Sequence, residues 1–90
     1  MTIYELIIEP EREEHIARHH VTGDEAEEIA LGTKVALRTR NRRYALIGQT
    51  AGGRYLKVIV APRGGGLYGL VTAMAASDSE RRLYQRHHGN

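Results

Sequence analysis

Regular alternation of apolar and polar residues in the second half of the chain constrains the fold most strongly. From Lys34 onward the hydrophobic period is two, which is the period of a β-strand. Short turns interrupt this pattern at 41–42, 51–53 and 63–66. Because such short turns can join only antiparallel neighbours, the pattern predicts a four-stranded antiparallel meander. The expected strands are 34–40, 44–50, 55–61 and 67–74.

The N-terminal part of the chain predicts a strand followed by a helix. Residues 2–8 are rich in isoleucine, leucine and tyrosine, which are common in strands. Pro10 and the glutamates that follow it suit the first turn of a helix, which we expect to run to about His19. The first strand is therefore followed directly by a helix.

Two capping boxes predict the starts of two further helices. Thr22 with Glu25, and Ser77 with Glu80, each place a hydroxyl three residues before a glutamate. We expect Gly32 to end the first of these helices. The C-terminal helix has one partly apolar stripe: Leu83, Tyr84 and His87. The order β-α-α-β-β-β-β-α predicts a single α+β domain over residues 1–90, an antiparallel sheet with helices packed on it.

Residue composition excludes several classes of site. The chain has no cysteine, which excludes disulfides, cysteine-based metal sites and a thiol nucleophile. His15 and His19 are spaced to reach one metal ion, but no third ligand follows at a suitable spacing, so we predict no metal and no cofactor. The first residues lack the features of a signal peptide, and no apolar run is long enough to span a membrane. We therefore expect a cytoplasmic protein.

Charge is distributed very unevenly along the chain. Residues 1–33 carry nine acidic residues and two arginines, a net charge of −7. Residues 34–90 carry eleven basic residues and two acidic ones, a net charge of +9. This asymmetry indicates a basic face for a polyanion and an acidic face for solubility or for a basic partner. The alternative is that the charges are ordinary solvated surface.

A group of basic residues follows the predicted hairpins. The sequence predicts Arg38 and Arg40 on one face of a strand. The adjoining turn adds Arg42 and Arg43, and the next hairpin adds Arg54 and Lys57. Guanidinium groups bind phosphate through paired hydrogen bonds. The tyrosines available to stack on a base or to fill the core are Tyr55, Tyr68 and Tyr84. Because no predicted helix carries the positive charge, the pattern favours single-stranded RNA over duplex DNA.

Four blocks of sequence resemble the successive motifs of one protein family. They are RHHVTGDEAEEI (18–29), RYALIG (43–48), GGRYLKVIV (52–60) and VTAMAASDSERRLY (71–84). In this order they resemble the BrnT family of toxins from bacterial type II toxin–antitoxin pairs. The resemblance implies a RelE-like fold and metal-independent RNA cleavage by attack of the ribose 2′-hydroxyl. It also implies neutralisation by a DNA-binding ribbon-helix-helix antitoxin, with a heterotetramer as the expected complex.

The resemblance also implies roles for individual residues. His19 matches a family histidine that would act as base or acid, and Arg43 and Arg54 match basic positions that would stabilise charge. Tyr84 matches the C-terminal helix motif, where it would either pack the helix onto the sheet or reach a phosphate with its hydroxyl. The residues expected to bind RNA are Arg38, Arg40, Arg42, Lys57 and Arg81. For Glu80 in the same helix, the capping box by itself explains the residue.

Two positions depart from the family pattern. His20 stands where the family often has glycine, and Met74 stands at a family arginine. Losing one such cation would cost about 3 kcal/mol of transition-state stabilisation, near a hundredfold in rate. Three hypotheses therefore remain: a ribonuclease toxin, an attenuated toxin that only binds antitoxin and RNA, and an interaction module with no catalytic history.

Overall fold

The alternating segments form the predicted strands in a computed structural model, which describes residues 1–88. The strands are β1 (Glu5–Ile7), β2 (Val35–Arg38), β3 (Tyr44–Gln49), β4 (Tyr55–Gly64) and β5 (Leu67–Ala75). The helices are α1 (Pro10–Ala17), α2 (Gly23–Leu31) and α3 (Asp78–His88), with a short 3₁₀ turn η1 at Arg40–Arg42. The predicted α+β order is confirmed. Among the described residues, no helix is long and apolar enough to cross a membrane.

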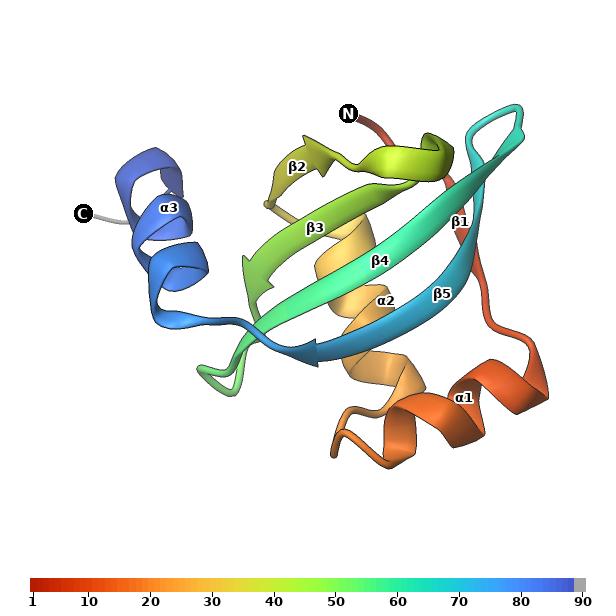
Figure 1. Ribbon diagram of the computed structural model, residues 1–90, viewed down its shortest axis with the longest axis horizontal. Helices are drawn as coiled ribbons and strands as arrows, with labels where there is room; N and C mark the ends of the chain where they lie inside the picture. Colours follow the sequence, from red (N-terminus) through yellow and green to blue (C-terminus); the bar gives the residue numbers. More distant parts are fainter. Residues whose placement is uncertain (89–90) are drawn as a thin grey trace.

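All five strands join one sheet in the order β1-β5-β4-β3-β2 (Figure 1). Strands β2 to β5 form the predicted antiparallel meander, since each is hydrogen-bonded to the next along the chain. Strand β1 instead lies parallel to β5, with Leu6 opposite Tyr68. The sequence predicts an antiparallel sheet, and this parallel pair is the one difference. A parallel partner is reached only through a long crossover, so no short turn in the sequence indicates it.

The sheet carries helices on both of its faces. Leu56 and Val58 of β4 point to one face, where they pack in the core with Ile29 of α2. Their neighbours Tyr55 and Lys57 point to the opposite face, because successive side chains of a strand alternate. Both of these contact α3. Figure 1 accordingly shows α2 crossing behind the sheet, whereas α3 stands beside the end at which β3 finishes.

Both predicted capping boxes are confirmed. The Glu25 N–H donates to Thr22 Oγ1 at 3.1 Å, and the Thr22 N–H donates to Glu25 Oε1 at 3.0 Å. At the start of α3, the Glu80 N–H donates to Ser77 Oγ at 3.2 Å and the Ser77 N–H donates to Glu80 Oε1 at 2.8 Å. Each box pairs two backbone N–H donors, one of the N-cap residue and one of the glutamate, that the helix start would otherwise leave unpaired.

His20, which replaces a family glycine, adopts the left-handed backbone conformation that glycine favours, with φ of 60°. The His20 N–H donates to Ala17 O at 3.0 Å and the Val21 N–H donates to Ile16 O at 3.2 Å. These two bonds form a Schellman motif at the end of α1. Val21 and Ile16 are both buried, which supplies the apolar contact typical of this motif. The loop therefore turns as a glycine would turn it, despite the imidazole.

We expect His20→Gly to stabilise the protein by about 0.5–1 kcal/mol. A left-handed residue with a Cβ costs about 1–2 kcal/mol, and the greater backbone entropy of an unfolded glycine offsets about 0.5–1 kcal/mol of the gain. Urea denaturation would measure the change in the free energy of unfolding. His20→Ala keeps a Cβ and should give no such gain. If His20→Ala stabilises as much as His20→Gly, the imidazole and not the backbone is responsible.

Candidate functional site

The start of β4 is tied to a helix on each face of the sheet. On one face, Arg54 Nη1 lies 2.8 Å from Glu25 Oε2, at the start of α2. On the other, Lys57 Nζ lies 2.9 Å from Glu80 Oε2, at the start of α3. Both glutamates belong to the capping boxes described above. Each capping glutamate thus holds its own helix start and, at the same time, a cation of the sheet.

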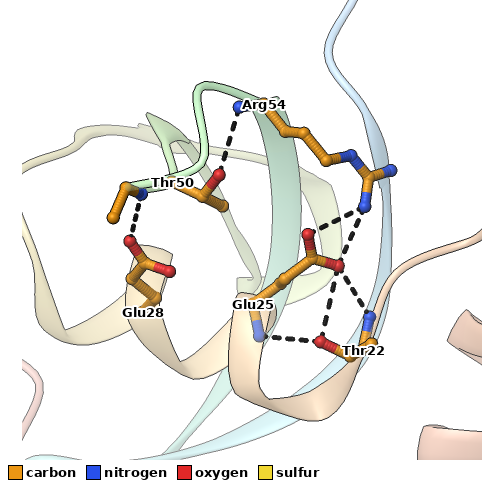
Figure 2. Close-up of polar contacts among 6 residues, drawn as sticks. Thr22, Glu25, Glu28, Thr50 and Arg54 are labelled. Carbon is orange, nitrogen blue, oxygen red and sulfur yellow. Dashed lines mark hydrogen bonds and ion pairs between the residues drawn. The ribbon is translucent and has the colours of Figure 1, made fainter.

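Arg54 is fixed in a structural network (Figure 2). Its guanidinium contacts both carboxylate oxygens of Glu25, at 2.9 and 2.8 Å. The backbone N–H of Arg54 donates to Thr50 Oγ1 at 3.1 Å. The adjoining turn is held by Glu28, whose carboxylate accepts the Ala51 N–H. The charge of Arg54 is therefore largely matched by Glu25, and its position holds the β3–β4 turn against α2.

The pKa of Glu25 is lowered below its usual value of 4.5, chiefly by the hydrogen bond from the Thr22 backbone and also by Arg54. A carboxyl with a lowered pKa in the folded state contributes stability above pH 4.5, and that contribution is lost as the pH falls. We therefore expect the urea midpoint to fall as the pH is lowered through 4.5 and below. Glu25→Gln should lower the midpoint at pH 7 and flatten this pH dependence. An unchanged slope in Glu25→Gln would contradict the assignment.

Lys57 and α3 meet on the other face of the sheet. Burial alone would raise the pKa of Glu80, but hydrogen bonds from Ser77 and Lys57 outweigh it and lower the pKa below 4.5. Glu80 is therefore an anion at neutral pH. Met74 is the cross-strand neighbour of Lys57 in the pairing of β4 with β5, so its side chain shares this face.

Tyr55 is contacted by three side chains of α3. The ring of Tyr84 lies edge-on to it with ring centroids 6.0 Å apart. The guanidinium carbon of Arg81 lies 4.7 Å from the centre of the Tyr55 ring, within the range of a cation–π contact. Gln85 Nε2 donates to the Tyr55 hydroxyl at 3.2 Å. We call the following set the α3 cluster: Tyr55, Lys57, Met74, Glu80, Arg81 and Tyr84.

Tyr84 is almost completely buried, with 9% of its surface exposed. Its ring is packed between Tyr55 and His88, whose ring centroid lies 5.2 Å away. The packing role that an aromatic residue usually has is therefore the one this structure displays for Tyr84. Arg81, one turn earlier on α3, remains exposed above the Tyr55 ring.

The arginines around η1 form a second basic site. Arg38, Arg40, Arg42 and Arg43, here called the basic hairpin, are all exposed. None of them forms an ion pair with any other residue in 1–88. The prediction that Arg40 shares a strand face with Arg38 is wrong, because β2 ends at Arg38 and the chain then turns. Asn41 and Arg42 make this turn with φ of 63° and 58°.

The residues that the family resemblance assigns to catalysis lie in separate places. Arg43 and Arg54 flank opposite ends of β3, about 20 Å apart by the rise of a strand. His19 is exposed in the loop after α1, with its ring 5.4 Å from that of His15. Tyr84 lies in the α3 cluster, on the face opposite α1 and α2. Of the residues predicted to bind RNA, Lys57 and Arg81 meet in the α3 cluster, and Arg38, Arg40 and Arg42 in the basic hairpin.

No three histidine, aspartate or glutamate side chains within residues 1–88 come together in a way that could hold a metal ion.

Some of the unevenly distributed charges of the sequence pair with one another within the fold. Of the three ion pairs among the described residues, Arg54–Glu25 and Arg63–Glu9 join the basic part of the chain to its acidic part. The four arginines of the basic hairpin are among the cations of residues 1–88 that these pairs leave free.

Two features of the sheet face that carries α3 could not be predicted from the sequence alone. The central place of Tyr55 depends on three residues of α3 that are about 26–30 positions away along the chain. Thr72 points to the same face as Met74, because the two are separated by one residue on β5. Its hydroxyl oxygen is buried and has no hydrogen-bond partner among the residues described.

Comparison with known proteins places the fold. A solved structure, the 1.1 Å crystal structure of the Brucella abortus ribonuclease toxin BrnT, superposes with a TM-score of 0.64. The two sequences are 25% identical, and the match covers 87% of this chain and 99% of that chain. No protein-family model and no curated protein matches the sequence. The structural match confirms the resemblance to BrnT that the four sequence blocks indicate.

Proposed function

We propose that this chain, which has a BrnT-like fold, is a ribonuclease toxin of a bacterial type II toxin–antitoxin pair. The observation that carries the proposal is the match to the Brucella abortus ribonuclease toxin over 99% of that chain. The α3 cluster supports it, since Lys57 is paired there with Glu80 and Arg81 lies over the Tyr55 ring of the same cluster. Two cations and one anion leave a net positive charge where a phosphate would bind.

We assign the reaction centre to the α3 cluster. In metal-independent cleavage the ribose 2′-hydroxyl gives its proton to a base and its oxygen attacks the adjacent phosphorus. The bond from phosphorus to the 5′-oxygen breaks, and that oxygen takes up a proton from an acid or from water. Glu80 is the carboxylate of this cluster and is assigned the first proton, although its lowered pKa makes it a weak base and limits the expected rate. Lys57 and Arg81 would stabilise the charge that gathers on the phosphate. Tyr84 would position Tyr55 and with it Arg81, because it is buried against the Tyr55 ring.

The other residues that the resemblance assigns to catalysis receive different roles in this proposal. Arg54 is a structural residue, because it holds the β3–β4 turn against α2, on the face opposite the α3 cluster. His19 belongs to the side of the molecule that carries α1 and α2, and it is a less suitable base for a reaction at the α3 cluster. Arg43 joins Arg38, Arg40 and Arg42 in the basic hairpin, where exposed guanidinium groups would bind the RNA backbone.

An attenuated toxin is the second candidate, and the environment of Met74 favours it. Met74 lies beside Lys57 and brings no charge to the α3 cluster. Lys57 is matched by Glu80, and Arg81 rests on the Tyr55 ring. A cluster with so little free positive charge would bind RNA and stabilise the transition state only weakly. In this reading the chain binds antitoxin and RNA without cutting RNA at a useful rate.

Incubation of the purified protein with labelled single-stranded RNA, in the presence of EDTA, tests the proposal. We expect cleavage products that end in a 2′,3′-cyclic phosphate, and growth arrest when the protein is produced in bacteria. Absence of cleavage by this chain, with cleavage by Met74→Arg, would support the attenuated toxin. RNA binding that weakens steeply with salt, without cleavage by either protein, would leave an interaction module as the remaining hypothesis.

We propose that the partner is a ribbon-helix-helix antitoxin that also binds DNA. The support is the BrnT-like fold and the basic hairpin, which offers an acidic partner four exposed cations. A dimeric antitoxin would bring two copies of the toxin into a heterotetramer. We place this complex in the cytoplasm, where its RNA substrate would be found. Light scattering of the co-expressed pair would measure the mass of the complex. A mass equal to one toxin and one antitoxin would exclude the heterotetramer.

A further inference from the structure

The outer edge of β2 is an open side of the sheet. Strand β2 is last in the sheet order, with β3 on one side only. The Thr39 N–H donates to Arg43 O at 2.9 Å, so Thr39 and Arg43 form a hydrogen-bonded pair. In an antiparallel ladder such pairs alternate with pairs that are not hydrogen-bonded. Ala36 and Arg38 therefore direct their backbone N–H and C=O groups away from β3.

Helix α3 confirms that this edge accepts a hydrogen bond from outside. Lys34 lies two residues before Ala36, so its backbone groups point to the same side of the strand as those of Ala36 and Arg38. The Lys34 carbonyl accepts a hydrogen bond from His88 Nε2 at 2.9 Å. Helix α3 also lies close to β2 itself. Within residues 1–88, the outward backbone groups of Ala36 and Arg38 have no hydrogen-bond partner.

Side chains beside this edge combine apolar surface with positive charge. Leu37 is 40% exposed, an unusual degree for a large apolar residue of a strand. Arg38 closes the strand and begins the basic hairpin. An extended segment that lies along β2 would thus meet two free backbone positions, an exposed leucine and a group of unpaired guanidinium groups.

A second copy of this chain fits the edge poorly. Antiparallel pairing of two β2 strands centred on Ala36 would place Lys34 of each copy opposite Arg38 of the other. Like charges directly opposite one another destabilise a sheet, and His88 already occupies the Lys34 carbonyl. The charge of the edge therefore opposes self-association and selects for carboxylates.

We infer that the outer edge of β2 binds an acidic, extended segment of a partner protein as an added strand. The segment pairs with the backbone of Ala36 and Arg38 and places its carboxylates on the basic hairpin. That this partner is the antitoxin rests on the proposed function; the rest of the inference does not. If the partner is the antitoxin, its added strand would cover the arginines that RNA needs, and antitoxin and RNA would exclude each other.

A fluorescent peptide of alternating glutamate and valine is a direct probe of the edge. Ala36→Pro removes an outward N–H that the β2–β3 ladder does not use, so the fold should survive the change. Ala36→Val keeps this N–H and is the matched control. We expect the peptide to bind the parent protein and Ala36→Val alike, and Ala36→Pro about tenfold more weakly, as measured by fluorescence anisotropy. Circular dichroism and thermal melting would verify that both variants are folded.

Equal affinity for folded Ala36→Pro and Ala36→Val would overturn the inference, because binding would then need charge alone. Failure of the peptide to bind the parent, while oligouridylate binds all three proteins, would also overturn it and assign the basic hairpin to RNA. Peptide binding requires no RNA cleavage. A protein that binds the peptide at the edge but never cuts RNA would refute the proposed function and leave the inference standing.

Discussion

Met74→Arg is expected to raise the rate of RNA cleavage by about a hundredfold. Residue 74 is the cross-strand neighbour of Lys57 and is half-buried on the face that carries α3. A guanidinium there would add a permanent positive charge within the α3 cluster, where the charge of Lys57 is matched by Glu80. Single-turnover cleavage of a labelled single-stranded RNA would give the rate constant for each protein.

Met74→Gln is the control for this prediction, because glutamine is similar in length and polar but uncharged. It should leave the rate near that of the parent protein. The same rate gain with Met74→Gln would show that polarity and not charge is limiting. If Met74→Arg binds RNA normally but cuts no faster, the α3 cluster is not the reaction centre.

Lys57→Met is expected to lower the cleavage rate by about a hundredfold, measured in the Met74→Arg background if the parent rate is too low. The substitution removes the cation that lies 2.9 Å from Glu80 and leaves that carboxylate facing the phosphate without a counter-charge. The methionine preserves most of the apolar stem, so packing of β4 changes little. Single-turnover rates at saturating RNA would separate this effect from weaker binding.

Arg63→Met is the matched control for Lys57→Met. Arg63 also belongs to β4 and also forms an ion pair, with Glu9 at 3.0 Å, but it lies near the opposite end of the strand. Its loss should leave the rate constant unchanged, because exposed ion pairs contribute little. Equal losses of rate in the two variants would point to overall charge, and no loss in Lys57→Met would remove Lys57 from the mechanism.

Much of the local structure could be predicted because it depends on residues close together in the sequence. The capping boxes of Thr22 and Ser77 form bonds within three residues, and both appear as predicted. The meander follows from a period of two and from turns too short for anything but antiparallel pairing. The four BrnT-like blocks were sufficient to indicate the family resemblance that the structural match confirms.

The arrangement of the candidate site could not be predicted in the same way. Arg54 and Lys57 look equivalent in the sequence, as two cations three residues apart near the start of a strand. Their spacing is odd, so alternation sends them to opposite faces of the sheet once the strand is formed. Each then meets a different helix, and the partners Glu25 and Glu80 are 29 and 23 residues away.

By itself the sequence determined the helix starts, the antiparallel meander with its turns, the unequal charge of the two halves, and a methionine where the BrnT family has an arginine. These features depend on neighbouring residues or on composition. Only the tertiary structure decided that β1 joins β5 in parallel, that α3 lies on the face opposite α2, and that Met74 stands beside Lys57. The physical reason is that long-range contacts depend on strand register and on which face each side chain occupies, and a single sequence encodes neither directly.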